Sequence, residues 1–158
     1  MMRIGQSSDI HPLVEGRDLI LGGVKIEHYK GCAGHSDGDA LIHAVCEAII
    51  GALGLGDIGY HFPDTDDKYK GINSLLLLEE VYKLMDNKGY KINNVDSLIL
   101  LEKPKLLPYK KLMEENIAKA LCCDVNDINV KATRGEKLGF IGNEEGVMAQ
   151  AVVLLREK

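Results

Sequence analysis

Residues 35–53 read HSDGDALIHAVCEAIIGAL, a stretch that predicts a helix with one buried face. Ser36 or Asp37 can cap this helix, which we expect to begin near Gly38 and to run to about Leu53. Its apolar side chains recur three and four positions apart, which is the spacing of a helix face packed against a core. These positions are Leu41, Ala44, Val45, Ala48, Ile49 and Ala52.

His43 lies on a stripe of the same helix that carries Asp39 four residues before it and Glu47 four residues after it. A carboxylate beside an imidazole fixes the orientation of the ring, which is a common arrangement around a metal-bound histidine. The alternative is a surface histidine in a salt bridge. His43 is therefore a candidate ligand whose partners must come from elsewhere in the chain.

Asp9 and His11 stand two residues apart near the start of the chain. If residues 3–11 form a strand that ends before Pro12, both side chains point to one face, and Ile10 points to the other, into apolar packing. A hydrogen bond between Asp9 and His11 at the strand end is the alternative. With His43, the pair makes an Asp/His/His set with an open fourth position, the pattern of catalytic rather than structural zinc.

The rest of the chain alternates between predicted strands and helices, which suggests an α/β or α+β fold with helices packed on a sheet. We expect a hairpin at 19–26, strands at 94–101, 128–133 and 147–156, and helices at 73–88 and 109–121. The helix at 73–88 should bury Leu76, Leu77, Val81, Leu84 and Met85. A length of 158 residues fits one catalytic domain that spans residues 1–158.

The composition is that of an ordinary globular protein, with 46% hydrophobic and 27% charged residues. A net charge of −5 argues against a nucleic-acid-binding role, which needs a basic surface. No apolar run approaches the roughly 18 residues of a membrane helix, and no signal peptide is evident, so we expect no membrane partner. The four cysteines form no CxxC pair, which favours reduced thiols and a cytoplasmic location.

Four segments carry residue types that bind phosphate or a cation. His35–Gly38 precedes the predicted helix, where backbone N–H groups attract anions, although a plain N-cap is the alternative. The loop at 54–67 is rich in glycine and aspartate, but its spacing does not fit an EF-hand. Residues 103–105 and 131–137 combine lysine, arginine and threonine as a polyphosphate site requires, and Glu136 among these cations suggests a bridging magnesium ion. A charged surface loop is the alternative.

Taken in order, these motifs resemble those of the 2-C-methyl-D-erythritol 2,4-cyclodiphosphate synthase family over essentially the whole chain. The resemblance rests on Asp9-x-His11, His35-Ser36-Asp37-Gly38-Asp39, His43, Gly56-Asp57-Ile58-Gly59, Phe62-Pro63-Asp64-Thr65-Asp66, Pro104-Lys105, Asn129-Val130-Lys131-Ala132-Thr133 and Glu136-Lys137-Leu138-Gly139-Phe140. It implies an α+β fold with a mixed sheet packed by helices on one face. It also implies a homotrimer in which the sheets face inward and the active sites lie at subunit interfaces.

The resemblance further implies a phosphorus–oxygen lyase of non-mevalonate isoprenoid biosynthesis. The enzyme would convert 4-diphosphocytidyl-2-C-methyl-D-erythritol 2-phosphate into 2-C-methyl-D-erythritol 2,4-cyclodiphosphate and CMP. The implied cofactors are one Zn²⁺ per active site, held by Asp9, His11 and His43, and Mg²⁺ or Mn²⁺ held with the substrate by Glu136. The enzyme-class alternative is a zinc-dependent phosphohydrolase acting on a nucleotide diphosphate, and the non-enzyme alternative is a trimeric scaffold that binds nucleotide or metal.

His35 and position 134 match the family residues that stabilise the transition state. The implied substrate-binding residues are Asp9, His11, His35, Ser36, Asp57, Ile58, Gly59, Phe62, Asp64, Asp66, Leu101, Pro104, Lys105, Leu107, Thr133, Arg134, Glu136, Phe140 and Asn143. Three positions depart from the family pattern: Arg134 replaces a threonine, Asn143 replaces an arginine of the central trimer cavity, and Ser7 replaces a glycine.

Overall fold

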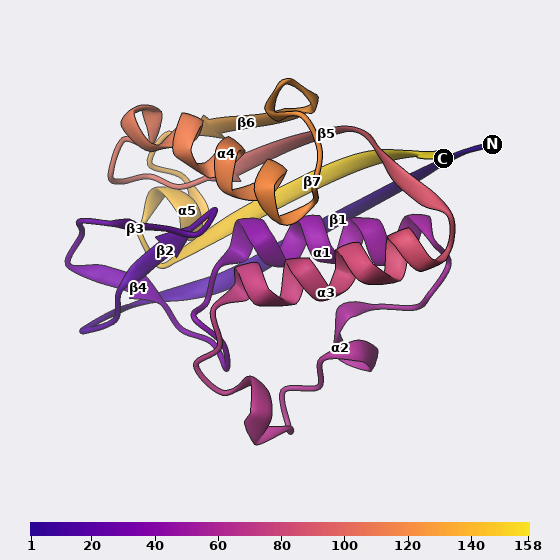
Figure 1. The fold of residues 1–158 in the computed structure, drawn as a ribbon. Helices are drawn as coiled ribbons and strands as arrows, with labels where there is room; N and C mark the ends of the chain where they lie inside the picture. Colours follow the sequence, from indigo (N-terminus) through magenta and orange to yellow (C-terminus); the bar gives the residue numbers. More distant parts are fainter.

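A computed structural model describes residues 1–158 as a curved, mixed five-stranded sheet with helices on one face (Figure 1). The α+β class expected from the sequence is therefore confirmed. The sheet strands are β1 (Met2–Glu15), β4 (Lys30–Cys32), β5 (Tyr90–Leu100), β6 (Ile128–Thr133) and β7 (Gly146–Glu157). A separate hairpin consists of β2 (Leu19–Leu21) and β3 (Val24–Ile26), and the helices are α1 (Ala40–Ala52), α2 (Ile58–His61), α3 (Ser74–Asn87), α4 (Lys110–Ala120) and α5 (Gly139–Gly142).

The strand order is β4-β1-β7-β5-β6, so the first and last long strands lie side by side in the centre of the sheet. β1 and β7 pair antiparallel over eleven residue pairs, from Met2 opposite Arg156 to Pro12 opposite Gly146. β7 is antiparallel to β5, whereas β5 and β6 run parallel. The strand predicted at 128–133 has those bounds in the structure, while the strands predicted at 3–11, 94–101 and 147–156 are longer than predicted.

Pro12 does not end the first strand, which corrects the predicted boundary. β1 continues to Glu15, but it changes partner at the proline: Pro12 is the last residue paired with β7, and Leu13 is the first paired with β4. Pro12 cannot donate a hydrogen bond, but its carbonyl still accepts one from Ala33 N at 2.9 Å. The proline therefore marks the point at which β1 passes from one ladder to the other.

Helix α1 begins at Ala40 because Asp39, rather than Ser36 or Asp37, is its N-cap. The Asp39 carboxylate accepts from Ile42 N at 3.0 Å and also from the N–H groups of Gly22 and Gly23 in the β2–β3 turn, at 3.0 and 2.7 Å. Complete burial raises the pKa of this carboxyl to about 6, although the three N–H donors oppose that shift. One carboxylate thus starts the helix and fixes the hairpin to it.

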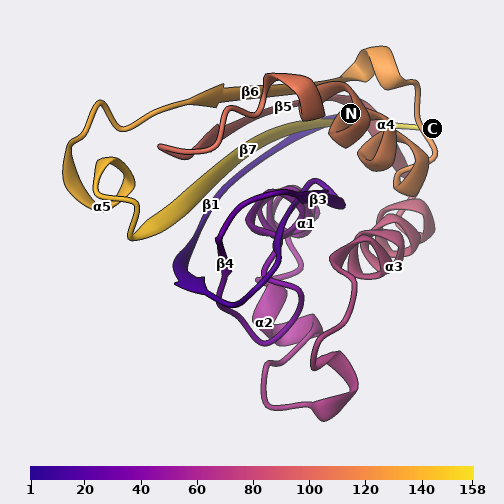
Figure 2. The same cartoon turned by 90° about the vertical axis from the view of Figure 1, so that its left-hand side faces the viewer.

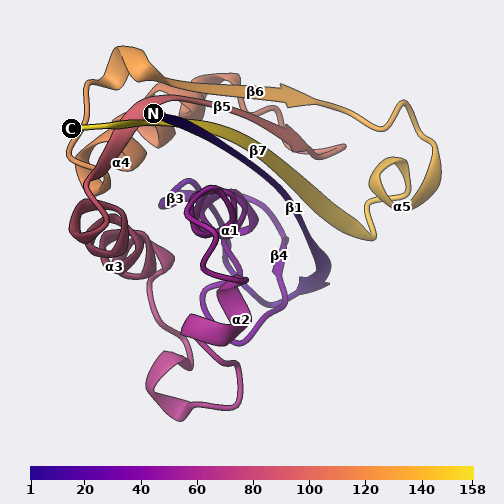
Figure 3. The ribbon, with the colours of Figure 1, turned by 90° about the vertical axis from the view of Figure 1, so that its right-hand side faces the viewer.

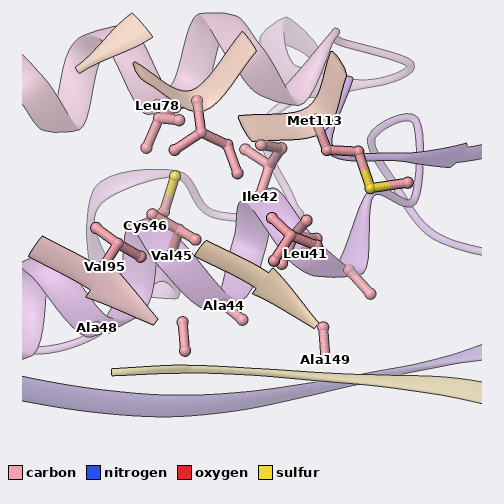
Figure 4. Packing of buried hydrophobic residues seen from close by; sticks show 14 of the residues in the cluster. Leu41, Ile42, Ala44, Val45, Cys46, Ala48, Leu78, Val95, Met113 and Ala149 are labelled. Atoms are coloured by element: carbon pink, nitrogen blue, oxygen red, sulfur yellow. The ribbon is translucent and has the colours of Figure 1, made fainter. Parts of the chain in front are cut away.

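Helix α1 occupies the middle of a single core cluster of 39 buried residues (Figure 4). Its predicted inward positions are all buried, but so are Ile42, Cys46 and Ile50, because α3 covers the side of α1 that faces away from the sheet (Figure 2). The predicted inward face of α3 was wrong at two positions, since Leu76 is exposed and Leu84 is only partly buried, whereas Leu78 is fully buried.

Gly5 of β1 lies directly against α1. A side chain there would overlap the backbone carbonyl of Ala48 and crowd Ala52 N, so only glycine permits this approach. The helix consequently lies close enough to the strand for side chains further along both elements to meet.

The opposite face of the sheet has no helix over it (Figure 3). Ile10 points away from the Asp9–His11 side as expected, but it is 55% exposed on this face and not packed in the core of the chain. Ile4, at 71% exposed, and Val152, at 42%, share the same face. The chain therefore presents apolar surface on the outer side of its central strands. None of its helices is long and apolar enough to span a membrane.

Replacing Gly5 with alanine should lower the free energy of unfolding by about 2 kcal/mol or more, because the added methyl group collides with the backbone of α1. Gly51→Ala is the matched control, since a side chain at this α1 position meets no atom within 4 Å and alanine favours helix by up to about 1 kcal/mol. Chemical denaturation measures both values. Equal stability of the two variants would contradict the close contact.

Candidate metal centre and substrate clefts

Asp9 and His11 of β1 and His43 of α1 lie together, as the sequence predicted. Asp9 Oδ2 is 2.7 Å from His11 Nε2 and 3.5 Å from His43 Nδ1. All three potential ligand atoms lie within 4.8 Å of one another. No other group of three or more histidine, cysteine or acidic side chains in the chain meets this distance.

The hydrogen bonds around Asp9 and His11 fit a bound cation. His11 Nδ1 is 2.8 Å from the Ala33 carbonyl, which can only accept, so this nitrogen carries a proton. In the neutral ring, Nε2 then presents a lone pair to Asp9 Oδ2, and both atoms are buried without any other partner. Either a second proton or a metal ion must lie between them. One carboxylate oxygen and two imidazole nitrogens with room for a fourth ligand are a donor set that suits zinc.

A proton and a metal ion would compete for this position. Burial alone lowers the pKa of His11, but the Asp9 carboxylate more than offsets this effect, and the net pKa is raised. For Asp9, burial raises the pKa, while the two neighbouring histidines lower it to about 2. Metal binding must displace the imidazole proton, so the metal affinity should fall as pH decreases.

The side chains around the other nitrogen of His43 differ from the prediction. Neither Asp39 nor Glu47 contacts the ring: Asp39 caps the helix, and Glu47 accepts from Ser7 Oγ at 3.3 Å. Instead, His43 Nε2 lies 3.0 Å from Ser36 Oγ and 2.9 Å from Ser74 Oγ. Helical spacing predicted a carboxylate beside the ring. In the structure, a serine from the loop before α1 and a serine from the start of α3 occupy that position instead.

Two residues that the sequence analysis missed hold this loop. Arg17 donates to the Gly34 and Ser36 carbonyls, both at 3.1 Å, and so binds the backbone on either side of His35. Ser74 joins the loop to α3. An isolated arginine or serine outside any motif carries no sequence signal for such a role.

A cleft of about 440 Å³ opens beside His11 and His43. Of the predicted site residues, it brings together His11, His35, Ser36, His43, Ile58, Gly59, Phe62 and Asp64, with Pro63, Tyr69 and Leu77 as further lining. Asp57 and Asp66 do not line it. They are the N-caps of α2 and of the 3₁₀ turn at Asp67–Tyr69, and they shape the loop that bounds the cleft.

A second cleft of about 470 Å³ lies between the loop after β5 and the loop after β6. It collects the predicted residues Leu101, Pro104, Lys105, Leu107, Thr133, Arg134 and Glu136, together with Lys110. Glu102 also lines the cleft and joins the two loops, because its carboxylate accepts a hydrogen bond from Gly135 N at 2.9 Å. The backbone of Gly135 is thus held by Glu102, while the charged side chains of Arg134 and Glu136 on either side of it are exposed.

Phe140 and Asn143 line neither cleft. Both belong to the α5 turn, where the Phe140 ring lies against Gly146 and Asn143 follows the last helical residue. The two clefts share no residue: one is lined by residues of β1, α1 and the α2 loop, and the other by the loops after β5 and β6. A single chain therefore keeps the metal ligands and the cationic loops apart.

Comparison with known proteins gives a consistent result. The sequence model of the YgbB family matches residues 2–156. The 2-C-methyl-D-erythritol 2,4-cyclodiphosphate synthase of Geobacillus sp. is 56% identical over 158 residues, which cover all of both chains. That of Chloroherpeton thalassium is 58% identical over 156 residues, or 99% of each chain.

Solved structures agree in fold. The bifunctional IspDF of Campylobacter jejuni superposes with a TM-score of 0.96 at 44% identity, over all of this chain and 43% of that longer one. A 2C-methyl-D-erythritol-2,4-cyclodiphosphate synthase with bound CDP gives 0.89 at 38% identity, over 98% of this chain and 100% of that chain. The chain therefore belongs to the YgbB family, and the two curated relatives described above are 2-C-methyl-D-erythritol 2,4-cyclodiphosphate synthases.

Proposed function

We propose that the protein converts 4-diphosphocytidyl-2-C-methyl-D-erythritol 2-phosphate into 2-C-methyl-D-erythritol 2,4-cyclodiphosphate and CMP. The synthase activity follows from family membership over the whole chain. The observation that supports this chemistry most directly is the Asp9–His11–His43 cluster beside a cleft. We place the reaction in the cytoplasm and assign it to one domain, residues 1–158.

Asp9, His11 and His43 would hold zinc with a fourth position open to a substrate phosphate oxygen. Zinc bound there would polarise that phosphate and neutralise its charge. The protein's own contribution is to place the ligands: β1 orients two of them and α1 the third. Glu136 would hold magnesium or manganese against the diphosphate, because an exposed carboxylate among Lys105, Lys110 and Arg134 otherwise repels phosphate.

In the reaction, an oxygen of the 2-phosphate attacks the β-phosphorus. A phosphorus–oxygen bond forms as the bond from the β-phosphorus to the bridging oxygen breaks, and CMP leaves with that oxygen. Both reacting groups belong to one substrate, so the enzyme's task is positioning and charge neutralisation. His35 and Arg134 would stabilise the charge on the transferring phosphoryl group.

The substrate has a methylerythritol phosphate end and a cytidine end, and we assign one cleft to each. The cleft beside the metal ligands holds the methylerythritol part, and the cleft at Leu101–Leu107 and Thr133–Glu136 holds the cytidine diphosphate. Because the two clefts share no residue in one chain, we propose that neighbouring subunits of a homotrimer each supply one of them. The apolar outer face of β1 and β7 would form the inward-facing interface.

Incubation of the protein with the cytidyl substrate, zinc and magnesium should give the cyclic diphosphate and CMP, which phosphorus NMR resolves. Removal of metal with a chelator, or His43→Ala, should abolish turnover, because the ligand set is then incomplete. Release of inorganic phosphate instead of the cyclic product would favour a phosphohydrolase. Full turnover after metal removal and in His43→Ala would contradict the metal centre.

Changing Glu136 to Gln should reduce the magnesium-dependent rate by roughly 100-fold or more with the fold intact, because the amide cannot neutralise the cation. Glu115→Gln is the control: this exposed α4 carboxylate lies outside both clefts, and its neutralisation changes net charge equally. Steady-state rates against magnesium concentration make the comparison. Unchanged magnesium dependence in Glu136→Gln would reject the assignment.

Placing a lysine at Ile4 should convert the trimer into smaller species and reduce activity with it, because a charge on the outer face opposes burial there. Leu76→Lys tests the same change on the exposed side of α3, where Leu76 is 50% exposed, and should leave assembly unchanged. Sedimentation velocity measures both. A monomeric, fully active parent protein would contradict the shared site.

A further inference from the structure

A chain of side chains runs from His43 away from the metal position. His43 Nε2 lies 2.9 Å from Ser74 Oγ, and Ser74 Oγ lies 2.5 Å from Asp37 Oδ1. Asp37 Oδ2 also accepts from Ser74 N at 3.0 Å, so the carboxylate holds both the backbone and the hydroxyl of this residue. Ser74 is fully buried as the first residue of α3.

The Asp37 carboxylate at the end of the chain sets the direction of these hydrogen bonds. An ionised carboxylate only accepts, so the Ser74 hydroxyl must donate its proton to Asp37. Its oxygen is then left as an acceptor toward His43, and the proton on that side of the ring must lie on Nε2. Nδ1, which faces Asp9, keeps its lone pair for a metal ion.

Ser36 cannot fix the ring in this way by itself. Its oxygen is 3.0 Å from His43 Nε2 and accepts from Gly38 N at 3.3 Å, but its own hydroxyl proton has no carboxylate partner. A free hydroxyl can rotate to donate to the ring as readily as to accept from it. The carboxylate at the end of the Ser74 chain removes that freedom.

His11 is oriented by a different device, because its Nδ1 bonds to the Ala33 backbone carbonyl. That contact cannot be deleted by a side-chain substitution. His43 is therefore the ligand whose orientation depends on side chains outside the metal cluster. The backbone of the same segment also holds the loop before α3, since Asp37 N donates to the Ile72 carbonyl at 3.1 Å and Gly71 N donates to the His35 carbonyl at 2.7 Å.

We propose that Asp37 and Ser74 form a positioning relay that fixes His43 with its proton on Nε2 and thereby sets the affinity of the site for its metal ion. The relay rests on the metal centre of the proposed function. It adds two residues, one of them in the HSDGD motif, that touch neither metal nor reacting atoms.

Zinc affinity measured by competition with a chromophoric chelator tests the relay without reference to turnover. Ser74→Ala should bind zinc about 10- to 100-fold more weakly than the parent, the usual effect of losing a partner of a metal-bound histidine. Ser97→Ala is the matched control: Ser97 is also a buried serine, and its hydroxyl donates to the Asn129 carbonyl at 2.9 Å, outside the metal cluster. It should keep the parental affinity.

Asp37→Asn tests the far end of the relay. The Asp37 carboxylate accepts from Ser74 Oγ, Ser74 N and Asp39 N, whereas an asparagine amide has a single acceptor oxygen and must oppose one backbone donor in either orientation. Zinc binding should weaken here as well, in protein whose circular dichroism matches the parent.

The outcomes separate the two proposals. Parental zinc affinity in folded Ser74→Ala and Asp37→Asn would overturn the relay and leave the metal centre standing. A parent protein that does not bind zinc would overturn the metal centre, and the relay with it. Equal weakening in Ser97→Ala would also overturn the relay, because the loss would then reflect general destabilisation.

Discussion

The close contact between β1 and α1 is the constraint on which the rest of the structure depends. Gly5 removes the side chain that would keep the helix away from the strand. Further along, Ser7 contacts Glu47 and Asp9 contacts His43, so β1 and α1 run in opposite directions along their contact. Two strand residues span about 6.6 Å and four helical residues about 6 Å, so the two periodicities stay in step over these contacts. The metal ligands meet because this register carries His43 to the level of Asp9.

The strand order of the sheet also fixes the position of the second cleft. β7 follows β1 along eleven residue pairs, and β5 and β6 are added beyond it, so the loops with Lys105 and Arg134 lie across the sheet from the metal ligands. A fold with one helix-covered face leaves the other face for a partner. Ile4, Ile10 and Val152 expose apolar side chains on that face, and burying them against a partner would be more favourable than leaving them in contact with water. In the proposed homotrimer, the uncovered face and the two separate clefts would both follow from this one architecture.

Much of this could be predicted from the sequence because strong periodicities carry it. The helix with His43, the strand with Asp9 and His11, and the strand at 128–133 follow from local patterns, and the ligand cluster follows from them. The errors lie where tertiary contacts override local signals. Asp39 caps α1 because the β2–β3 turn supplies further donors, and β1 passes Pro12 because β4 takes over its pairing. Ser74 and Arg17 could not be found from sequence, since their partners are backbone groups and loops distant along the chain.

Zinc anomalous diffraction shows directly whether Asp9, His11 and His43 hold a zinc ion. Crystals grown with zinc would be measured on either side of the zinc absorption edge. We expect an anomalous peak about 2.0–2.2 Å from Asp9 Oδ2, His11 Nε2 and His43 Nδ1. The absence of a peak at this position in zinc-loaded crystals, or a peak held by other side chains, would contradict it.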